Sequence, residues 1–212
     1  MPMTLPTLLT LMRIALVPVL VVLFYLPFGW SNIATVAVFI LAAVTDWADG
    51  YLARRIGQLT RFGEFLDPVA DKIMVATALI LLVQQQEIRE VVFAISAAVI
   101  VGREITISAL REWMSGIGER ALVSVSWIGK TKTGFQMTAI GFLLYHEDLG
   151  PLPIALIGEI LLYTAAALTL WSMWSYLQSA WPVISDSRHH QAYEGRVPDA
   201  SEDAAGDTGS NP

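Results

Sequence analysis

Six apolar segments divide the first 181 residues of this 212-residue chain, and most of them are close to the length that a helix needs to cross a bilayer. A helix crosses the hydrocarbon core with about 20 residues, because each residue advances the helix by about 1.5 Å. The segments run over residues 6–28, 32–53, 67–84, 91–110, 133–145 and 154–181. The sequence therefore predicts an all-α, polytopic membrane protein with six transmembrane helices.

The composition favours a membrane protein over a soluble one. Hydrophobic residues make up 55% of the chain and charged residues only 15%, whereas soluble domains carry about 25% charged residues. The mean hydropathy is +0.56. The chain has no cysteine, which excludes a disulfide framework, a thiolate metal site and a cysteine nucleophile. We expect the lipid bilayer, and no nucleic acid, among its partners.

The end of the chain differs in composition from the rest. Residues 182–212 carry six acids and two bases, a net charge of −4 out of −6 for the whole chain, and almost no large apolar residues. Such a segment buries too little apolar surface to offset the entropy of ordering. We therefore expect a transmembrane domain over residues 1–181 and a disordered acidic tail over residues 182–212.

The basic residues outside the tail fall mainly on one side of the predicted membrane. If both termini are cytoplasmic, the three connections on the opposite side carry only Arg89. The two cytoplasmic connections carry seven bases, namely Arg54, Arg55, Arg61, Arg111, Arg120, Lys130 and Lys132. Because cytoplasmic loops are enriched in Lys and Arg, the sequence predicts this orientation.

Residues 45–72 place four aspartates where the second predicted helix ends and the third begins. Two are three residues apart and two are four residues apart, so each pair lies on one helix face: Asp46 with Asp49, and Asp67 with Asp71. Small residues, which would let a ligand approach closely, lie on the same faces at Gly50, Ala53 and Gly63. We expect the two helices to bring the four carboxylates together at the cytoplasmic end.

Four neighbouring carboxylates at the edge of a membrane need positive charge nearby, because ionised groups are costly there and repel one another. Nearby bases could supply it, and so could divalent ions. Oxygen ligands alone suit hard ions such as Mg²⁺ or Mn²⁺. Two such ions between carboxylates are typical of phosphoryl transfer, and a carboxylate that is not fully used as a ligand can act as a base.

The order of these residues resembles the complete signature of the CDP-alcohol phosphotransferase family. The pattern is Asp46-x-x-Asp49-Gly50-x-x-Ala53-Arg54, eight residues, then Gly63-x-x-x-Asp67-x-x-x-Asp71. The likeness extends to residues 6–14, 103–114, 125–133 and 168–173, and is strongest to bacterial members whose acceptor is sn-glycerol 3-phosphate. It implies a homodimeric, multi-pass enzyme of the bacterial inner membrane. Such an enzyme transfers a phosphatidyl group from CDP-diacylglycerol to that acceptor and releases CMP.

The resemblance also implies a role for each signature residue. The ligands of two Mg²⁺ or Mn²⁺ ions would be Asp46, Asp49, Asp67 and Asp71, with Asp71 also the catalytic general base. CDP-diacylglycerol would contact Asp46, Asp49, Gly50, Ala53, Arg54 and Gly63. The acceptor has a phosphate of its own, which requires a second basic site, and the candidates are Arg103, Arg111, Lys130 and Lys132. Arg103 could instead pair with Glu104 or an aspartate, and the other three could serve topology.

Three further interpretations stay open at this point. A sibling enzyme would use another alcohol, such as inositol phosphate, serine or phosphatidylglycerol. An ion-coupled transporter would use the carboxylates for its coupling cation, although the chain has no evident internal repeat, which transporters tend to show. A structural membrane protein with buried ion pairs is the third alternative, and unchanged activity and stability of Asp71→Asn would favour it.

Overall fold

The computed structural model describes residues 5–56, 61–85, 91–116 and 127–185. These residues form six α-helices and no β-strand beyond one isolated bridge between Leu149 and Leu152. The helices are α1 (Leu5–Tyr25), α2 (Ser31–Ile56), α3 (Arg61–Gln84), α4 (Val91–Gly116), α5 (Trp127–Tyr145) and α6 (Ile154–Ser185). The prediction of an all-α protein is confirmed for this part of the chain.

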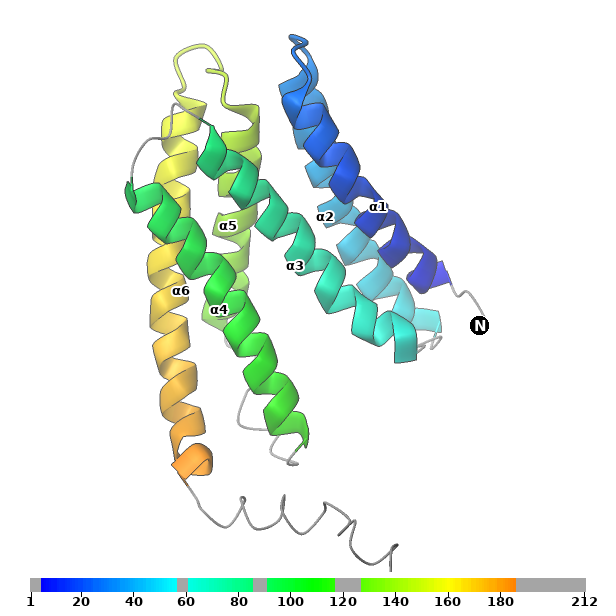
Figure 1. The fold of residues 1–212 in the computed structure, drawn as a ribbon, viewed down its shortest axis with the longest axis vertical. Helices are drawn as coiled ribbons and strands as arrows, with labels where there is room; N and C mark the ends of the chain where they lie inside the picture. The colour runs from blue at the N-terminus through cyan, green and yellow to red at the C-terminus, as the bar shows by residue number, and fades with distance from the viewer. Residues whose placement is uncertain (1–4, 57–60, 86–90, 117–126, 186–212) are drawn as a thin grey trace, which may run out of the picture.

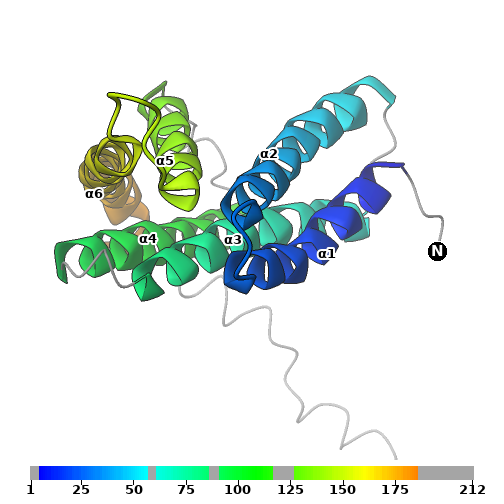
Figure 2. The ribbon, with the colours of Figure 1, turned by 90° about the horizontal axis from the view of Figure 1, so that it is seen from above.

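The six helices run alternately up and down, so that the helix ends meet in two groups (Figure 1). The lower group contains the start of α1, the end of α2 and the start of α3, the end of α4 and the start of α5, and the end of α6. Helices α1 and α2 pack against each other, as do α5 and α6, while α3 packs mainly against α1 and α4 packs mainly against α6 (Figure 2). The signature residues on α2 and α3 therefore lie at the same end as the start of α5.

The helices bury one side and leave apolar side chains exposed on the other. The core includes Leu20, Phe39, Leu79, Phe93 and Leu143, which are at most 2% exposed. Large apolar side chains elsewhere stay exposed, among them Val22, Ile80, Val91, Trp171 and Trp174. A water-soluble protein rarely leaves so much apolar surface open, and this surface suits contact with lipid.

Three of the helices are long and apolar enough to cross a membrane, over Thr7–Tyr25, Val91–Met114 and Ile154–Gln178. A shorter apolar helix covers Ser31–Asp46. The described residues thus form a multi-pass membrane protein by length and composition, and the six-span topology stays a prediction.

Several predicted helix boundaries are wrong. Helix α3 starts at Arg61, so that Pro68 lies inside the helix and not at its first position, and α5 starts at Trp127 and not at residue 133. The predicted polar connection is therefore helical at Arg111, Lys130 and Lys132. The reason is that hydropathy marks the apolar part of a helix, whereas backbone hydrogen bonding continues into the polar flanks. Helix α6 likewise includes residues 182–185, and the rest of the predicted tail lies outside the described residues.

Gly158 on α6 allows close contact with α5, and we expect Gly158→Ala to destabilise the fold. A Cβ atom at this position would lie 2.9 Å from Cγ of the buried Leu143 and 3.2 Å from Cβ of Phe142. Such overpacking costs about 1–3 kcal/mol, so the melting temperature in detergent should fall by several degrees. The control is Gly141→Ala on α5, where a Cβ would meet nothing within 4 Å. Equal melting temperatures for the two variants would contradict this account of the α5–α6 contact.

Candidate active site

An ion pair joins α1 to the signature helix α2. Arg13 Nη1 donates to Asp46 Oδ1 at 2.6 Å, and the two residues are 33 positions apart in sequence. The Arg13 side chain is 1% exposed, whereas that of Asp46 is 48% exposed. A buried guanidinium needs a carboxylate partner, so Arg13 both fixes the orientation of Asp46 and supplies positive charge at the start of the signature.

Of the four signature aspartates, the structure describes the side chains of Asp46 and Asp71. The backbones of Asp49, Gly50, Ala53, Arg54 and Asp67 lie on α2 and α3 as predicted, and their side chains lie outside the described part. Gly63 lies on α3 and is partly buried. Among the described side chains no group of three or more His, Asp or Glu residues could hold a metal ion. The convergence of all four carboxylates therefore stays a prediction.

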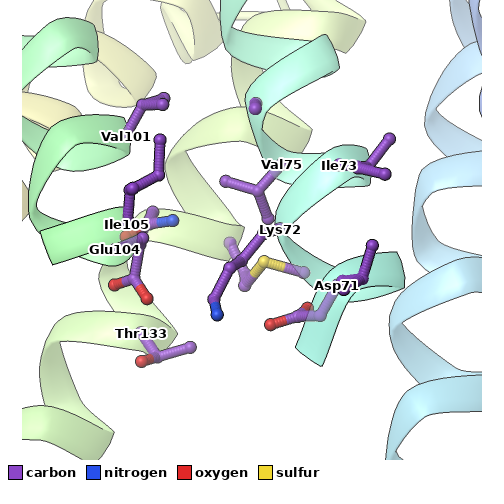
Figure 3. Close-up of a pocket in the computed structure, with 12 residues that line it drawn as sticks. Asp71, Lys72, Ile73, Val75, Val101, Glu104, Ile105 and Thr133 are labelled. Atoms are coloured by element: carbon purple, nitrogen blue, oxygen red, sulfur yellow. The ribbon is translucent and has the colours of Figure 1, made fainter. Parts of the chain in front are cut away.

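A cavity of about 330 Å³ lies between α3, α4 and α5, and Asp71 is at its edge. In Figure 3 the carboxylates of Asp71 and Glu104 and the amine of Lys72 all point into the space between α3 and α4. The polar residues of the lining are Asp71, Lys72, Glu104, Thr133 and Gln136, and the rest is mainly Val, Ile and Met. A volume of this size is within the range of small-molecule sites.

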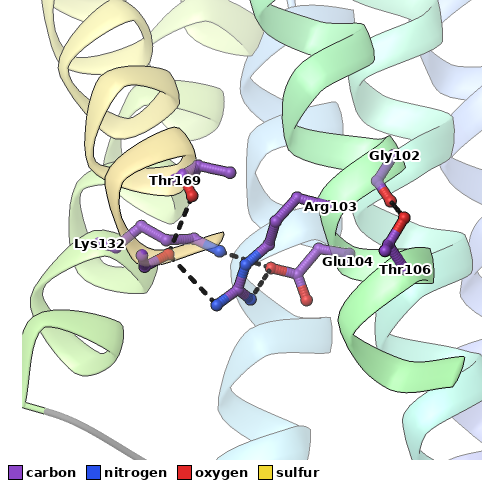
Figure 4. A network of polar contacts seen from close by, with 7 residues as sticks. Gly102, Arg103, Glu104, Thr106, Lys132 and Thr169 are labelled. Carbon is purple, nitrogen blue, oxygen red and sulfur yellow. Dashed lines mark hydrogen bonds and ion pairs between the residues drawn. The ribbon is translucent and has the colours of Figure 1, made fainter. Parts of the chain in front are cut away.

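Next to this cavity, Glu104 holds two basic side chains together (Figure 4). Its Oε1 accepts a hydrogen bond from Lys132 Nζ at 2.6 Å and another from Arg103 Nη1 at 3.1 Å. The side chains of Arg103 and Lys132 are 8% and 2% exposed, and that of Glu104 is 30% exposed. Glu104 thus connects α4 to α5 and lies between the cavity and the two buried cations.

Arg103 also contacts α6. Its Nη2 donates to Ser172 Oγ at 3.3 Å, and Ser172 Oγ in turn donates to the Thr169 carbonyl at 2.9 Å. The guanidinium lies 5.5 Å from the centre of the Tyr176 ring, at the distance of a cation–π contact. Arg103 Nε is buried without a hydrogen-bond partner in the described structure. The guanidinium is therefore fixed in position and retains a donor that a ligand could use.

The structure brings together some predicted site residues and not others. Arg103 and Lys132 meet through Glu104, so the pair of Arg103 with Glu104, which the sequence left open, is present. The side chains of Arg111 and Lys130 lie outside the described part. Glu104, Ser172 and Tyr176 were not predicted as site residues. Glu104 had one signal in the sequence, since it is a carboxylate next to a cation inside an apolar segment, which demands a local partner.

The model of the CDP-alcohol phosphatidyltransferase family matches residues 3–171, and the chain belongs to this family.

Similar proteins carry one particular name, CDP-diacylglycerol–glycerol-3-phosphate 3-phosphatidyltransferase. The relative from Salmonella choleraesuis is 51% identical over 180 residues, which cover 85% of this chain and 96% of the relative. The relative from Yersinia enterocolitica is 51% identical over 181 residues, covering 85% and 97%. The relative from Shigella flexneri is 51% identical over 180 residues, covering 85% and 96%.

Proposed function

We propose that this protein transfers the phosphatidyl group of CDP-diacylglycerol to sn-glycerol 3-phosphate, giving phosphatidylglycerophosphate and CMP. The observation that carries this proposal is the 51% identity to enzymes of that name over nearly their whole length. The complete signature on α2 and α3 and the cavity at Asp71 support it. The reaction would contribute to phosphatidylglycerol and cardiolipin synthesis.

In this proposal the acceptor lies in the cavity between α3, α4 and α5, with its 1-hydroxyl at Asp71. The Asp71 carboxylate takes the hydroxyl proton as the oxygen attacks the β-phosphorus of CDP-diacylglycerol. The new oxygen–phosphorus bond forms as the bond to the CMP oxygen breaks. A carboxylate at the edge of a cavity is placed to accept such a proton.

The family is generally dependent on divalent metal ions, and we propose Mg²⁺ or Mn²⁺, bound as two ions by Asp46, Asp49, Asp67 and Asp71. An all-carboxylate set fits such hard cations, and the pairing of Asp46 with the buried Arg13 supports a need for positive charge here. The ions would neutralise the diphosphate when bound. The donor would contact Asp46, Asp49, Gly50, Ala53, Arg54 and Gly63.

The phosphate of the acceptor would bind to basic residues beside the cavity. Arg103 and Lys132 are the two whose side chains the structure describes, and Arg111 and Lys130 complete the proposed set. The buried Nε of Arg103, which has no hydrogen-bond partner among the described residues, supports this assignment. Held together by Glu104, the two cations offer one fixed site to a dianion.

We further propose a homodimer in the bacterial inner membrane, with both termini and the active site in the cytoplasm. The excess of basic residues in the connections at one end of the helices supports this orientation. It would give the site access to the water-soluble acceptor and let the acyl chains of the donor remain in the bilayer.

The proposed reaction is tested by CMP release from the purified protein in detergent with CDP-diacylglycerol and Mg²⁺. Glycerol 3-phosphate, inositol 1-phosphate and serine are supplied separately, and we expect release with glycerol 3-phosphate alone. Release with a different alcohol would contradict glycerol 3-phosphate as the acceptor but would agree with the proposed type of reaction. Folded protein that releases no CMP with any acceptor, but moves a cation in sealed vesicles, would contradict the enzyme in favour of the transporter.

A further inference from the structure

The side-chain oxygen of one amide in the cavity has no hydrogen-bond partner among the described residues. Gln136 on α5 lines the cavity together with Asp71 and is 4% exposed, and its Oε1 is buried without a partner in the described structure. Burying a polar atom without a hydrogen bond is costly, and such groups are rare in folded proteins. The missing partner is explained if a bound ligand supplies the hydrogen bond to Gln136 Oε1.

The position of Gln136 indicates what kind of ligand group this is. Gln136 follows Lys132 by four residues, so both side chains lie on one face of α5. Lys132 is held by Glu104, which also lines the cavity, and Asp71 enters the cavity from α3. Gln136 is thus one helical turn from the proposed phosphate site, and the same cavity contains the proposed base.

The other side chains that line the cavity further limit which ligand group can lie at Gln136. Glu104 Oε1 already accepts hydrogen bonds from two cations, and most of the remaining lining is aliphatic, including Val75, Val101 and Ile105. An amide carbonyl accepts from a hydroxyl, and its NH₂ group can donate to the same oxygen. A neutral polyol carbon chain with one hydroxyl at Gln136 fits these mainly aliphatic walls.

We propose that Gln136 binds the 2-hydroxyl of glycerol 3-phosphate, the hydroxyl that does not react, and thereby selects this acceptor. This assignment rests on the proposed function. The 2-hydroxyl is on the carbon next to the one that carries the attacking oxygen, and the phosphate is on the carbon beyond. A hydrogen bond at the central carbon, between the phosphate site and Asp71, fixes which hydroxyl faces the base. Gln136 is then a specificity residue for the alcohol.

The test compares glycerol 3-phosphate with 3-hydroxypropyl phosphate, which has the same reactive hydroxyl and phosphate but lacks the 2-hydroxyl. CMP release is measured with both acceptors for the wild type and Gln136→Met. Because a buried polar group without its partner is costly, we expect the wild type to prefer glycerol 3-phosphate in kcat/KM by about 10- to 100-fold. In Gln136→Met the preference should fall to about 1–3-fold, mainly through a loss with glycerol 3-phosphate.

The matched control is Gln85→Met, at the far end of α3. Gln85 Oε1 is also buried without a partner, but the residue does not line this cavity, so the wild-type preference should remain. Gln136→Leu carries the same expectation as Gln136→Met, and release of CMP with 3-hydroxypropyl phosphate shows that each variant is folded.

Three outcomes would overturn the assignment. If the preference for glycerol 3-phosphate is the same in the wild type and both Gln136 variants, this assignment is overturned and the proposed function stands. The same holds if the variants lose kcat/KM equally with both acceptors. If the wild type releases no CMP with either acceptor, both this assignment and the proposed function are overturned.

Discussion

Asp71→Asn should reduce CMP release by about 10²- to 10⁴-fold, the usual contribution of a general base. The substitution keeps the size of the side chain and removes its ability to take a proton. Asp71 is exposed at the edge of the cavity and forms no ion pair with the described residues, unlike Asp46, which pairs with Arg13. We therefore expect the loss in kcat, with the melting temperature of the variant in detergent within a few degrees of the wild type.

The control for this prediction is Asp148→Asn, in the connection between α5 and α6 at the opposite end of the helices. Asp148 is exposed, and the same chemical change there should leave CMP release unaltered. Asp71→Glu, which retains a carboxylate but lengthens the side chain, should keep part of the activity. A folded Asp71→Asn protein with near wild-type release would exclude Asp71 as the base and favour a structural role for the aspartates.

The helices could be predicted from the sequence, because hydropathy reports directly which residues avoid water. Six segments were expected and the described residues contain six helices. The ends were harder to predict, since α3 includes residues 61–66 before the predicted start at Asp67, and α5 includes residues 127–132 before the predicted start at Thr133. Pro68 is informative, because a proline is usually read as a helix start, and here α3 continues through it at the loss of one backbone hydrogen bond.

The pairings within the site could not be predicted, because they depend on which helices are neighbours. Asp46 was singled out from its spacing, but its partner Arg13 is on another helix. Lys132 was read as part of a polar connection, and it lies buried on α5 because Glu104 on α4 accepts its hydrogen bond. The lack of a hydrogen-bond partner for Gln136 Oε1 among the described residues is likewise a property of three packed helices. Spacing within one helix shows which residues share a face, but it does not show which other helix packs against that face.

Glu104→Gln should destabilise the protein by about 2 kcal/mol and weaken acceptor binding. Removing one partner of a buried ion pair costs about 3–5 kcal/mol, because the other charge remains in a poorly solvated site. Here one carboxylate serves two buried cations, Arg103 and Lys132, but its own 30% exposure reduces the effect. The neutral amide would leave both cations repelling each other without a balancing charge, and thermal unfolding in detergent measures the loss.

If Glu104 stabilises the fold as an ion-pair partner, a second substitution should distinguish this role from a simple packing role. If the loss comes from uncompensated charge, then Lys132→Met in the Glu104→Gln background should restore part of the stability, since it removes one of the two stranded cations. A purely additive double variant would contradict the account. The control, Glu112→Gln at an exposed position of the same helix, should change the free energy of unfolding by less than about 0.5 kcal/mol.

The same substitution separates positioning from catalysis. Glu104 would act through Arg103 and Lys132, so in Glu104→Gln the KM for glycerol 3-phosphate should rise by about 10-fold, while kcat stays closer to the wild-type value than in Asp71→Asn. Asp71 acts on the hydroxyl, and its loss should appear in kcat. Steady-state CMP release over a range of glycerol 3-phosphate concentrations distinguishes the two patterns. A fall in kcat alone for Glu104→Gln would place this carboxylate at the reacting atoms and not beside the phosphate.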